Sequence, residues 1–345
     1  MKLKVLELFG GIGAPRKALE NLGVDVKSID YVEVLPYAVD AYNAIYDNNY
    51  KPQSVLNWNL NIDLLVHGSP CQDFSNAGKN DLKSGRSILY ERTLEIIELE
   101  LNPRPKFVVW ENVKGLINKK HIKHYQHYIN SMESLGYVNY TGTLNARDFG
   151  IPQNRERVFT ISIKNDVSKW FNFDMLERKP MKPLIYFLEK NPETVEGYDV
   201  TQPSMIKSME LGKTFIAMTY VNTISTKQVR WNATVIWKDY SNFYVYPRST
   251  DGELINGSHN RAWKEDKYIG CIPASKIPQI GKLAGENVMF RYLTQRECFR
   301  LMGFTDEDFD KILMKKIPKN TLYQLAGNSI VVPVLEAIFK ELLDL

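Results

Sequence analysis

The sequence predicts an α/β protein built on a doubly wound, mostly parallel sheet, with a smaller second unit. Through the first half of the chain, short apolar runs alternate with longer amphipathic stretches. The runs have the length of buried strands and the stretches have the length and periodicity of helices. Strands that alternate with helices form parallel sheets, because each helix returns the chain to the edge where the next strand starts.

The expected elements follow one another through the first 135 residues. Strands are expected at 5–8, 28–32, 64–67 and 107–110, and helices at 16–22, 36–46, 89–101 and 121–135. The strands are apolar on both faces, as in sheets covered by helices on both sides. Ligands of such sheets bind beyond the carboxyl ends of the strands, so the loops that follow strands are where a functional site is expected.

The pattern changes after about residue 175, where Pro- and Gly-punctuated segments replace the alternation. Between 215 and 268, aromatic residues are interleaved with Lys and Arg, a pattern that suits a nucleic-acid face. For each aromatic residue taken alone, packing in a β core is the favoured explanation. Amphipathic helices are expected again at 293–302 and 331–343. We therefore predict a large domain at 1–175, a second at 176–287, and a C-terminal segment, 288–345, that returns to the first.

Composition narrows the class of protein. With 345 residues, 44% hydrophobic and 24% charged, the chain should be globular. Three widely spaced cysteines indicate neither a disulfide framework nor a metal site, so no metal is expected. A net charge of +4 permits a nucleic-acid partner without requiring one. Glu7 interrupts the N-terminal apolar run, and no apolar run is seen to approach the ~20 residues of a membrane span, so we expect a cytoplasmic protein without membrane contact.

The first candidate motif is a glycine-rich turn at 9–13, between the first strand and the first helix. Glycines there let the backbone approach a nucleotide-like ligand closely. The spacing is not that of a full dinucleotide motif, so alone it favours a tight turn over any named cofactor. Glu33 ends the second strand about twenty residues later, where a carboxylate can accept hydrogen bonds from a ribose, although a surface glutamate is an equal alternative.

Three further strand ends carry reactive side chains. Cys71 follows the third strand, and a thiolate is a strong nucleophile once its pKa falls below about 8.5. Glu111 ends the fourth strand. A buried carboxylate there destabilises the fold unless it has a functional role or a charged or hydrogen-bonding partner. Arg155 and Arg157 are two apart in an extended segment, which predicts that both point to one side, toward an anion or a carbonyl. Each has a structural explanation alone, but together they indicate a catalytic site.

These blocks, in this order, resemble the DNA (cytosine-5)-methyltransferase family of bacterial or phage type. The Pro-Cys-Gln loop at 70–72, Glu-Asn-Val at 111–113 and Gln-x-Arg-x-Arg at 153–157 are followed by further matches at 291–304 and 323–330. The region 176–287 matches no particular motif, as is typical of the family's variable target-recognition domain. The resemblance implies the S-adenosylmethionine-dependent methyltransferase fold with that smaller domain inserted.

The resemblance also implies a role for each matching residue. Cys71 would add to carbon 6 of cytosine, Glu111 would hold the nitrogen 3 edge, and Arg157 with Arg155 would hold the 2-oxo group. The cytosine must leave the duplex to be reached in this way. The residues implied for S-adenosylmethionine are Phe9, Gly11, Ile12, Gly13, Glu33, Val34, Pro70, Asn328 and Ser329. Those implied for DNA are Gln72, Ser75, Lys79 and Arg86.

The implied activity is methylation of cytosine carbon 5 in a specific site of double-stranded DNA, leaving S-adenosylhomocysteine. We expect a monomer, which in a restriction–modification system would have a cognate restriction endonuclease as its partner. One alternative is a transfer-RNA cytosine-5-methyltransferase, whose branch of the family has a reduced recognition region. Another is a non-catalytic DNA-binding homologue, in which the cysteine or the glutamate is usually lost. A dinucleotide oxidoreductase would fit the sheet but leave residues 70–72 and both arginines unexplained.

Overall fold

The computed structural model describes most of the chain outside two regions. The described residues are 2–55, 62–69, 89–100, 103–190, 215–217, 221–222, 224, 234–237 and 290–345. Six residues predicted from the sequence for the site lie outside them, namely Pro70, Cys71, Gln72, Ser75, Lys79 and Arg86. Most of the predicted second domain also lies outside them, so its limits stay a prediction.

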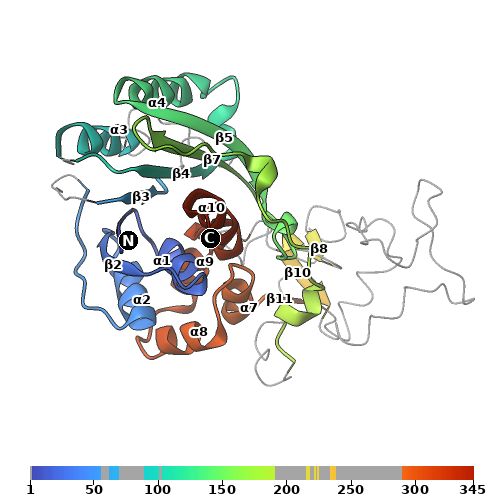
Figure 1. Ribbon diagram of the computed structural model, residues 1–345. Helices are drawn as coiled ribbons and strands as arrows, with labels where there is room; N and C mark the ends of the chain where they lie inside the picture. The colour runs from blue at the N-terminus through green and yellow to red at the C-terminus, as the bar shows by residue number, and fades with distance from the viewer. Residues whose placement is uncertain are drawn as a thin grey trace, which may run out of the picture.

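A six-stranded sheet with the order β2-β1-β3-β4-β7-β5 forms the centre of the molecule (Figure 1). Strands β1 (Leu3–Leu8), β2 (Val26–Val32), β3 (Leu64–His67) and β4 (Phe107–Val113) are parallel. Strand β7 (Glu156–Lys164) runs antiparallel between β4 and β5 (Tyr137–Asn145). The mostly parallel, doubly wound sheet predicted from the sequence is confirmed.

Helices cover both faces of this sheet (Figure 1). On one face lie α1 (Ala14–Asn21), α2 (Pro36–Tyr46) and α10 (Val332–Leu343), and on the other α3 (Leu89–Glu95), which continues into a π-helical turn (Ile96–Glu100), and α4 (Ile122–Ser134). The strands supply both cores because successive side chains point to opposite faces. Val5 and Val66 join the core beneath α1, whereas Leu6 and Leu65 join the core beneath α3 and α4.

The C-terminal segment adds four helices to the α1 face. They are α7 (Gln295–Arg300), α8 (Asp306–Leu313), α9 (Lys319–Asn328) and α10. Helix α10 packs against α1, and α8 packs against α2. An ion pair also joins α8 to α1, because Lys17 Nζ lies 2.8 Å from Asp308 Oδ1. Residues near both ends of the chain therefore build one layer of helices.

One stretch, Lys319–Leu343, is long and apolar enough to pass a composition test for a membrane span, with a mean hydropathy of 1.4. The second half of this stretch, 331–343, is predicted from the sequence as an amphipathic helix. In the structure it forms two helices, α9 and α10, separated at residues 329–331, and 72% of the tested window is buried. Its apolar residues belong to the core of the domain.

Shorter strands and turns connect this domain with the predicted recognition region. Strands β8 (Phe215–Ala217), β10 (Thr234–Trp237) and β11 (Phe290–Tyr292) form a three-stranded sheet, and β6 (Gln153–Asn154) pairs with β9 (Val221–Asn222). Single 3-10 turns occur at Lys114–Ile117, Ala146–Asp148, Phe173–Met175 and Leu184–Phe187. The β6 and β9 pairing brings the Gln-x-Arg-x-Arg motif against a piece of the recognition region.

A buried ion pair fixes the return of the chain to the first domain. Arg291 is 2% exposed and donates from both terminal nitrogens to the carboxylate of Glu297, at 2.7 and 2.9 Å. The same carboxylate accepts the backbone N–H groups of Glu189 and Thr294, both at 2.8 Å. The Glu297 carboxylate thus joins the start of α7 to the segment 183–190, because it accepts a backbone hydrogen bond from each.

Replacing Arg291 with methionine should destabilise the protein by about 3–5 kcal/mol, because it leaves the Glu297 carboxylate buried without its cation. Urea denaturation followed by circular dichroism would measure the loss. Arg178→Met is a matched control, because Arg178 pairs with Asp148 where both side chains are about half exposed, and should cost less than ~1 kcal/mol. Equal losses in the two variants would contradict the role of the buried pair.

Candidate active site

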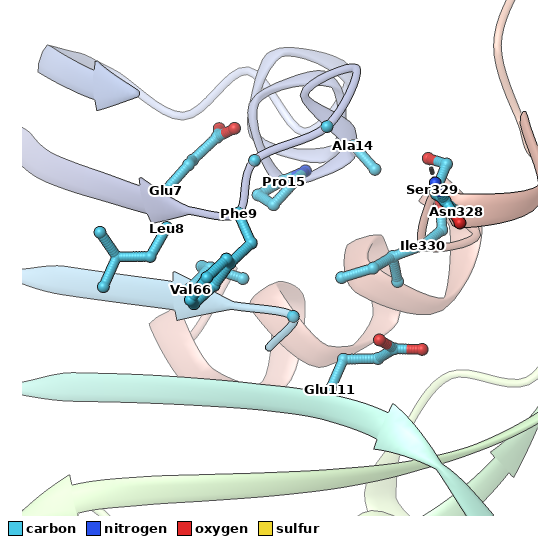
Figure 2. Close-up of a pocket in the computed structure, with 13 residues that line it drawn as sticks. Glu7, Leu8, Phe9, Ala14, Pro15, Val66, Glu111, Asn328, Ser329 and Ile330 are labelled. Carbon is cyan, nitrogen blue, oxygen red and sulfur yellow. Dashed lines mark hydrogen bonds between the residues drawn. The ribbon is translucent and has the colours of Figure 1, made fainter. Parts of the chain in front are cut away.

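A hollow opens where the carboxyl ends of β1, β3 and β4 meet the connection between α9 and α10 (Figure 2). Four motifs that are far apart in the sequence line it. They contribute Phe9, Gly10 and Gly11 from the glycine turn, Gly68 from the loop after β3, Glu111 from β4, and Asn328, Ser329 and Ile330 from the C-terminal segment. This is the edge of the sheet at which the sequence predicts a ligand.

Gly13 and Gly11 have different roles in the glycine turn. Gly13 has a φ of 78°, and a Cβ atom there would lie 2.5 Å from the ring of Tyr42, so a side chain has no room behind the turn. Gly11 has a φ of 55°, but a Cβ atom there would meet nothing within 4 Å. Gly13 therefore allows the turn to pack on the tyrosines of α2, while the backbone at Gly11 borders open space.

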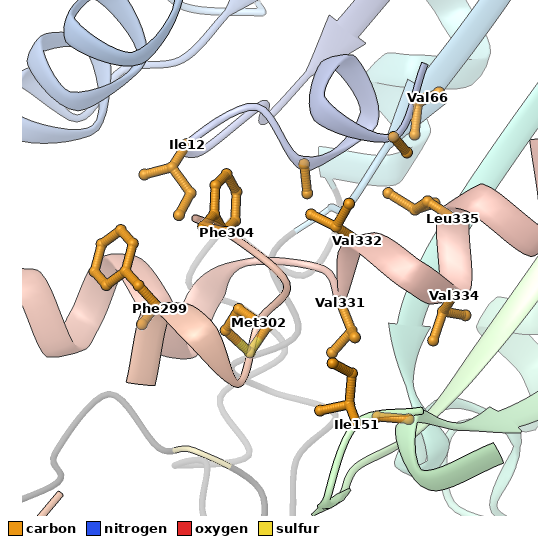
Figure 3. Packing of buried hydrophobic residues seen from close by; sticks show 14 of the residues in the cluster. Ile12, Val66, Ile151, Phe299, Met302, Phe304, Val331, Val332, Val334 and Leu335 are labelled. Carbon is orange, nitrogen blue, oxygen red and sulfur yellow. The ribbon is translucent and has the colours of Figure 1, made fainter. Parts of the chain in front are cut away.

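Of the residues that the resemblance implies for the cofactor, some line the hollow, and Ile12 lies in the core behind it. Phe9, Gly11, Asn328 and Ser329 line the hollow (Figure 2). Ile12 is 1% exposed and lies with Phe304 in the hydrophobic core behind the turn (Figure 3).

Glu33 is held by main-chain groups at the end of β2. Its carboxylate accepts hydrogen bonds from the N–H groups of Gly11 at 3.2 Å, Val34 at 2.8 Å and Leu35 at 2.9 Å. Glu33 thereby ties the glycine turn to β2. A carboxylate has about four acceptor positions, so capacity for a ribose hydroxyl remains. Val34 follows it and is exposed.

Glu111 and Arg157 form an ion pair beside the strand end that leads to Cys71. Arg157 Nε lies 3.1 Å from Glu111 Oε1, and both side chains are mostly buried. A Cβ atom on Gly68 would lie in van der Waals contact with Glu111 Oε2, at 3.6 Å, so the carboxylate stands directly beside the loop that follows β3. Burial raises the pKa of Glu111 above its usual value, and the charges of Arg157 and Arg155 partly oppose this rise.

The two arginines of the motif meet the two kinds of partner predicted for them, an anion and carbonyl groups. Arg157 belongs to β7 and pairs in register with Val113 of β4. Arg155 lies between β6 and β7, is 4% exposed, and donates to the carbonyl oxygens of Ile224, Gly327 and Ser329. Both positive charges act on Glu111 and lower its pKa against the effect of burial.

A buried polar layer behind the site is not anticipated by the sequence reasoning. Trp110 and His67 are register partners on β4 and β3, and their rings are stacked with centroids 5.8 Å apart. Trp110 Nε1 donates to Ser69 Oγ at 3.0 Å, and Tyr128 lies 3.1 Å from His67 Nε2. Burial lowers the pKa of His67 to about 3, so this histidine stays neutral. A signal for part of the layer was available, since Trp110 directly precedes Glu111 and Ser69 stands two residues before Cys71.

Replacing Trp110 with phenylalanine should slow the methyl transfer that the sequence resemblance implies by roughly 5- to 30-fold, corresponding to about 1–2 kcal/mol. The reason is that the buried hydroxyl of Ser69, two residues before Cys71, loses its donor. Single-turnover kinetics on DNA would measure this. The double variant Trp110→Phe, Ser69→Ala should be little worse than either single variant, because both remove the same hydrogen bond. Fully additive losses would show that the bond has no part in positioning the loop.

Glu7 is a second acidic side chain at the hollow, and the sequence reasoning treats it only as a break in an apolar run. It lies within β1, is fully buried, and lines the hollow behind the glycine turn. Burial raises the pKa of Glu7 to about 8, and attraction to Arg16 only partly offsets this. The hollow therefore has a largely protonated acid on one wall and the Glu111–Arg157 pair on another. Among the described residues, no group of three His, Cys, Asp or Glu side chains could hold a metal ion.

Comparison with known proteins gives one consistent family. A model of the C-5 cytosine-specific DNA methylases matches residues 3–344. The orphan methyltransferase M.SPRI of Bacillus phage SPR is 28% identical, over 99% of this chain and 98% of its own length. The type II methyltransferase M2.ScrFI of Lactococcus lactis subsp. cremoris is 35% identical, over 81% of this chain and 66% of its own length.

Solved structures share the fold. The Entamoeba histolytica methyltransferase EhMeth superimposes with a TM-score of 0.71 at 17% identity, over 100% of this chain and 98% of its own. The S. pombe Dnmt2 methyltransferase superimposes with a TM-score of 0.70 at 19% identity, over 99% of each chain. At such identities the likeness concerns the arrangement of the sheet and its helices.

Proposed function

This chain belongs to the C-5 cytosine-specific DNA methylase family, and we propose that its hollow binds S-adenosylmethionine and that the adjoining strand ends methylate carbon 5 of a cytosine flipped out of duplex DNA. One observation carries the proposal. The Glu111–Arg157 ion pair stands beside Gly68, at the edge of the hollow that the glycine turn also lines. Cys71 follows Gly68 by three residues, which span at most about 11 Å.

The residues around the hollow suit S-adenosylmethionine. The open backbone at Gly11, the ring of Phe9 and the polar groups of Asn328 and Ser329 offer both apolar contact and hydrogen bonds. Glu33 would receive the ribose, with Ile12 and Gly13 shaping the turn from behind and Val34 and Pro70 completing the pocket. When bound, S-adenosylmethionine supplies an electrophilic methyl group on its sulfonium.

The protein's own residues activate the cytosine ring. Cytosine carbon 5 is a poor nucleophile, so the Cys71 thiolate adds to carbon 6, and the electron pair of the 5,6 double bond becomes available at carbon 5. Glu111 hydrogen-bonds the nitrogen 3 edge and favours this addition. Arg157 orients Glu111 and faces the 2-oxo group. After carbon 5 is methylated, loss of its proton and departure of the thiolate restore the aromatic ring.

The substrate base must leave the duplex, because carbon 6 is attacked from above the ring plane. Gln72, Ser75, Lys79 and Arg86, all in the loop after β3, are proposed to contact the DNA around the vacated position. The region 176–287 is proposed to read the target sequence. We further propose that the enzyme acts as a monomer and that, where its gene accompanies a restriction endonuclease, it protects the host's DNA.

Bisulfite sequencing of plasmid DNA from cells that express the protein tests this function. Cytosines in one short sequence should resist conversion, and plasmid from cells carrying Cys71→Ser should show none. Bisulfite sequencing of RNA from the same cells tests the transfer-RNA alternative. Protected cytosines in transfer RNA with fully converted plasmid DNA would replace the proposed substrate, and full conversion of both nucleic acids by a folded protein would refute the activity.

A further inference from the structure

We propose that Arg155 and Gln153 couple the recognition region to the cofactor pocket, so that binding of DNA to the one strengthens binding of cofactor to the other. The inference deepens the proposed function and rests on it. Both residues are buried, and each hydrogen-bonds to the recognition region on one side and to the C-terminal segment on the other. They are positioning residues, because neither lines the hollow.

Arg155 makes the connection to the pocket wall. Its Nη1 donates to the carbonyl oxygen of Ile224 at 3.3 Å, and its Nη2 donates to those of Gly327 at 3.0 Å and Ser329 at 2.8 Å. Asn328, between the last two, lines the hollow together with Ser329. One planar guanidinium therefore fixes the distance between residue 224 and the wall of the cofactor pocket.

Gln153 makes the parallel connection to the helices. Its side chain is fully buried, accepts the N–H of Ile224 at 3.0 Å and donates to the carbonyl oxygen of Leu301 at 2.9 Å. The next carbonyl, that of Met302, accepts the N–H of Val332 at the start of α10 at 2.9 Å. The N–H of Val221 also donates to the carbonyl of Pro152 at 2.8 Å, which anchors the same piece of the recognition region.

These contacts connect Val221 and Ile224 to the wall of the pocket. The connecting hydrogen bonds are made to main-chain carbonyl and amide groups, so moving one side without the other leaves buried polar groups unpaired. DNA that fixes Val221 and Ile224 in this position also fixes Asn328 and Ser329 where they meet the cofactor. Linkage requires the effect to be reciprocal, so cofactor should strengthen DNA binding by the same factor.

The test compares dissociation constants of S-adenosylhomocysteine, with and without saturating unmethylated duplex that carries the target site identified by bisulfite sequencing. In the wild type, DNA should tighten binding at least about fivefold, the lower range of allosteric coupling. In Arg155→Lys and Gln153→Met the gain should fall below about twofold. Arg178→Lys, which changes an exposed arginine paired with Asp148, is the matched control and should keep the full gain.

A purely structural role predicts a different result, because weakened binding would then appear equally with and without DNA and leave the ratio unchanged. An unchanged ratio in both variants, at any absolute affinity, overturns the inference. The inference is also overturned if the wild type methylates DNA but binds S-adenosylhomocysteine equally tightly with and without DNA. In that case the proposed function stands. A wild type that neither binds nor methylates DNA defeats the proposed function and the coupling with it.

Discussion

Replacing Cys71 with serine is expected to abolish methyl transfer, lowering the single-turnover rate on cognate DNA by at least about 10⁴-fold. A serine hydroxyl is far less nucleophilic than a thiolate at neutral pH, and without addition to carbon 6 the ring is not activated at carbon 5. Binding of duplex DNA should be retained, because phosphate contacts provide most of the affinity. Transfer of tritium from labelled S-adenosylmethionine to DNA measures the first quantity and a filter-binding assay the second.

DNA with 5-fluorocytosine at the target position tests the same step by trapping it. Addition of sulfur at carbon 6 and methylation at carbon 5 can both occur, but elimination then requires loss of fluorine as a cation, which no base can bring about. The wild type should therefore become covalently attached to the DNA through Cys71, and Cys71→Ser should form no adduct. Cys298 is an internal control, because it is fully buried and burial raises the pKa of its thiol. An adduct on Cys298 or Cys271, or sustained turnover without any adduct, would overturn the mechanism.

Replacing Glu111 with glutamine should lower the single-turnover rate by ~100-fold or more, the range of a general acid or base. The variant keeps the shape of the side chain, so the DNA dissociation constant should change little. Arg157 would lose the carboxylate that it contacts at 3.1 Å, which adds to the effect. A fall of less than about fivefold would exclude this role for Glu111.

The pH profile separates the chemical role of Glu111 from its role as a partner of Arg157. Because burial raises the pKa of Glu111, a larger fraction of the carboxyl is protonated near neutral pH and can donate to nitrogen 3. Activity that depends on this proton should fall as pH rises through the pKa of Glu111, and Glu111→Gln should lack that fall. Arg157→Lys is the comparison, because it weakens the ion pair while the titrating carboxyl remains. A Glu111→Gln profile parallel to that of the wild type would contradict the assignment.

Much of the fold could be predicted because local patterns of apolar and polar residues specify its strands and helices. The apolar runs at 64–67 and 107–110 became β3 and β4, and the amphipathic stretch at 36–46 became α2 with the predicted limits. Strand β4 extends further, to Val113, because Glu111, Asn112 and Val113 pair with β7, and a polar residue at a strand end gives no local sign of pairing. The π-helical turn at Ile96–Glu100 likewise continues a helix that periodicity alone describes as regular.

The sequence by itself determined which residue types stand near the strand ends. The spacing of the motifs is enough to place Glu33 and Cys71 after the second and third strands and Glu111 in the last part of the fourth. Only the tertiary structure decided what each side chain touches. Register between β4 and β7 places Arg157 against Glu111, whereas Arg155, between β6 and β7, donates to main-chain carbonyls. The physical reason is that local alternation predicts the side on which a residue lies but not the group that it meets there. Contacts between strands and loops depend on strand order and register, which arise from packing of the whole chain.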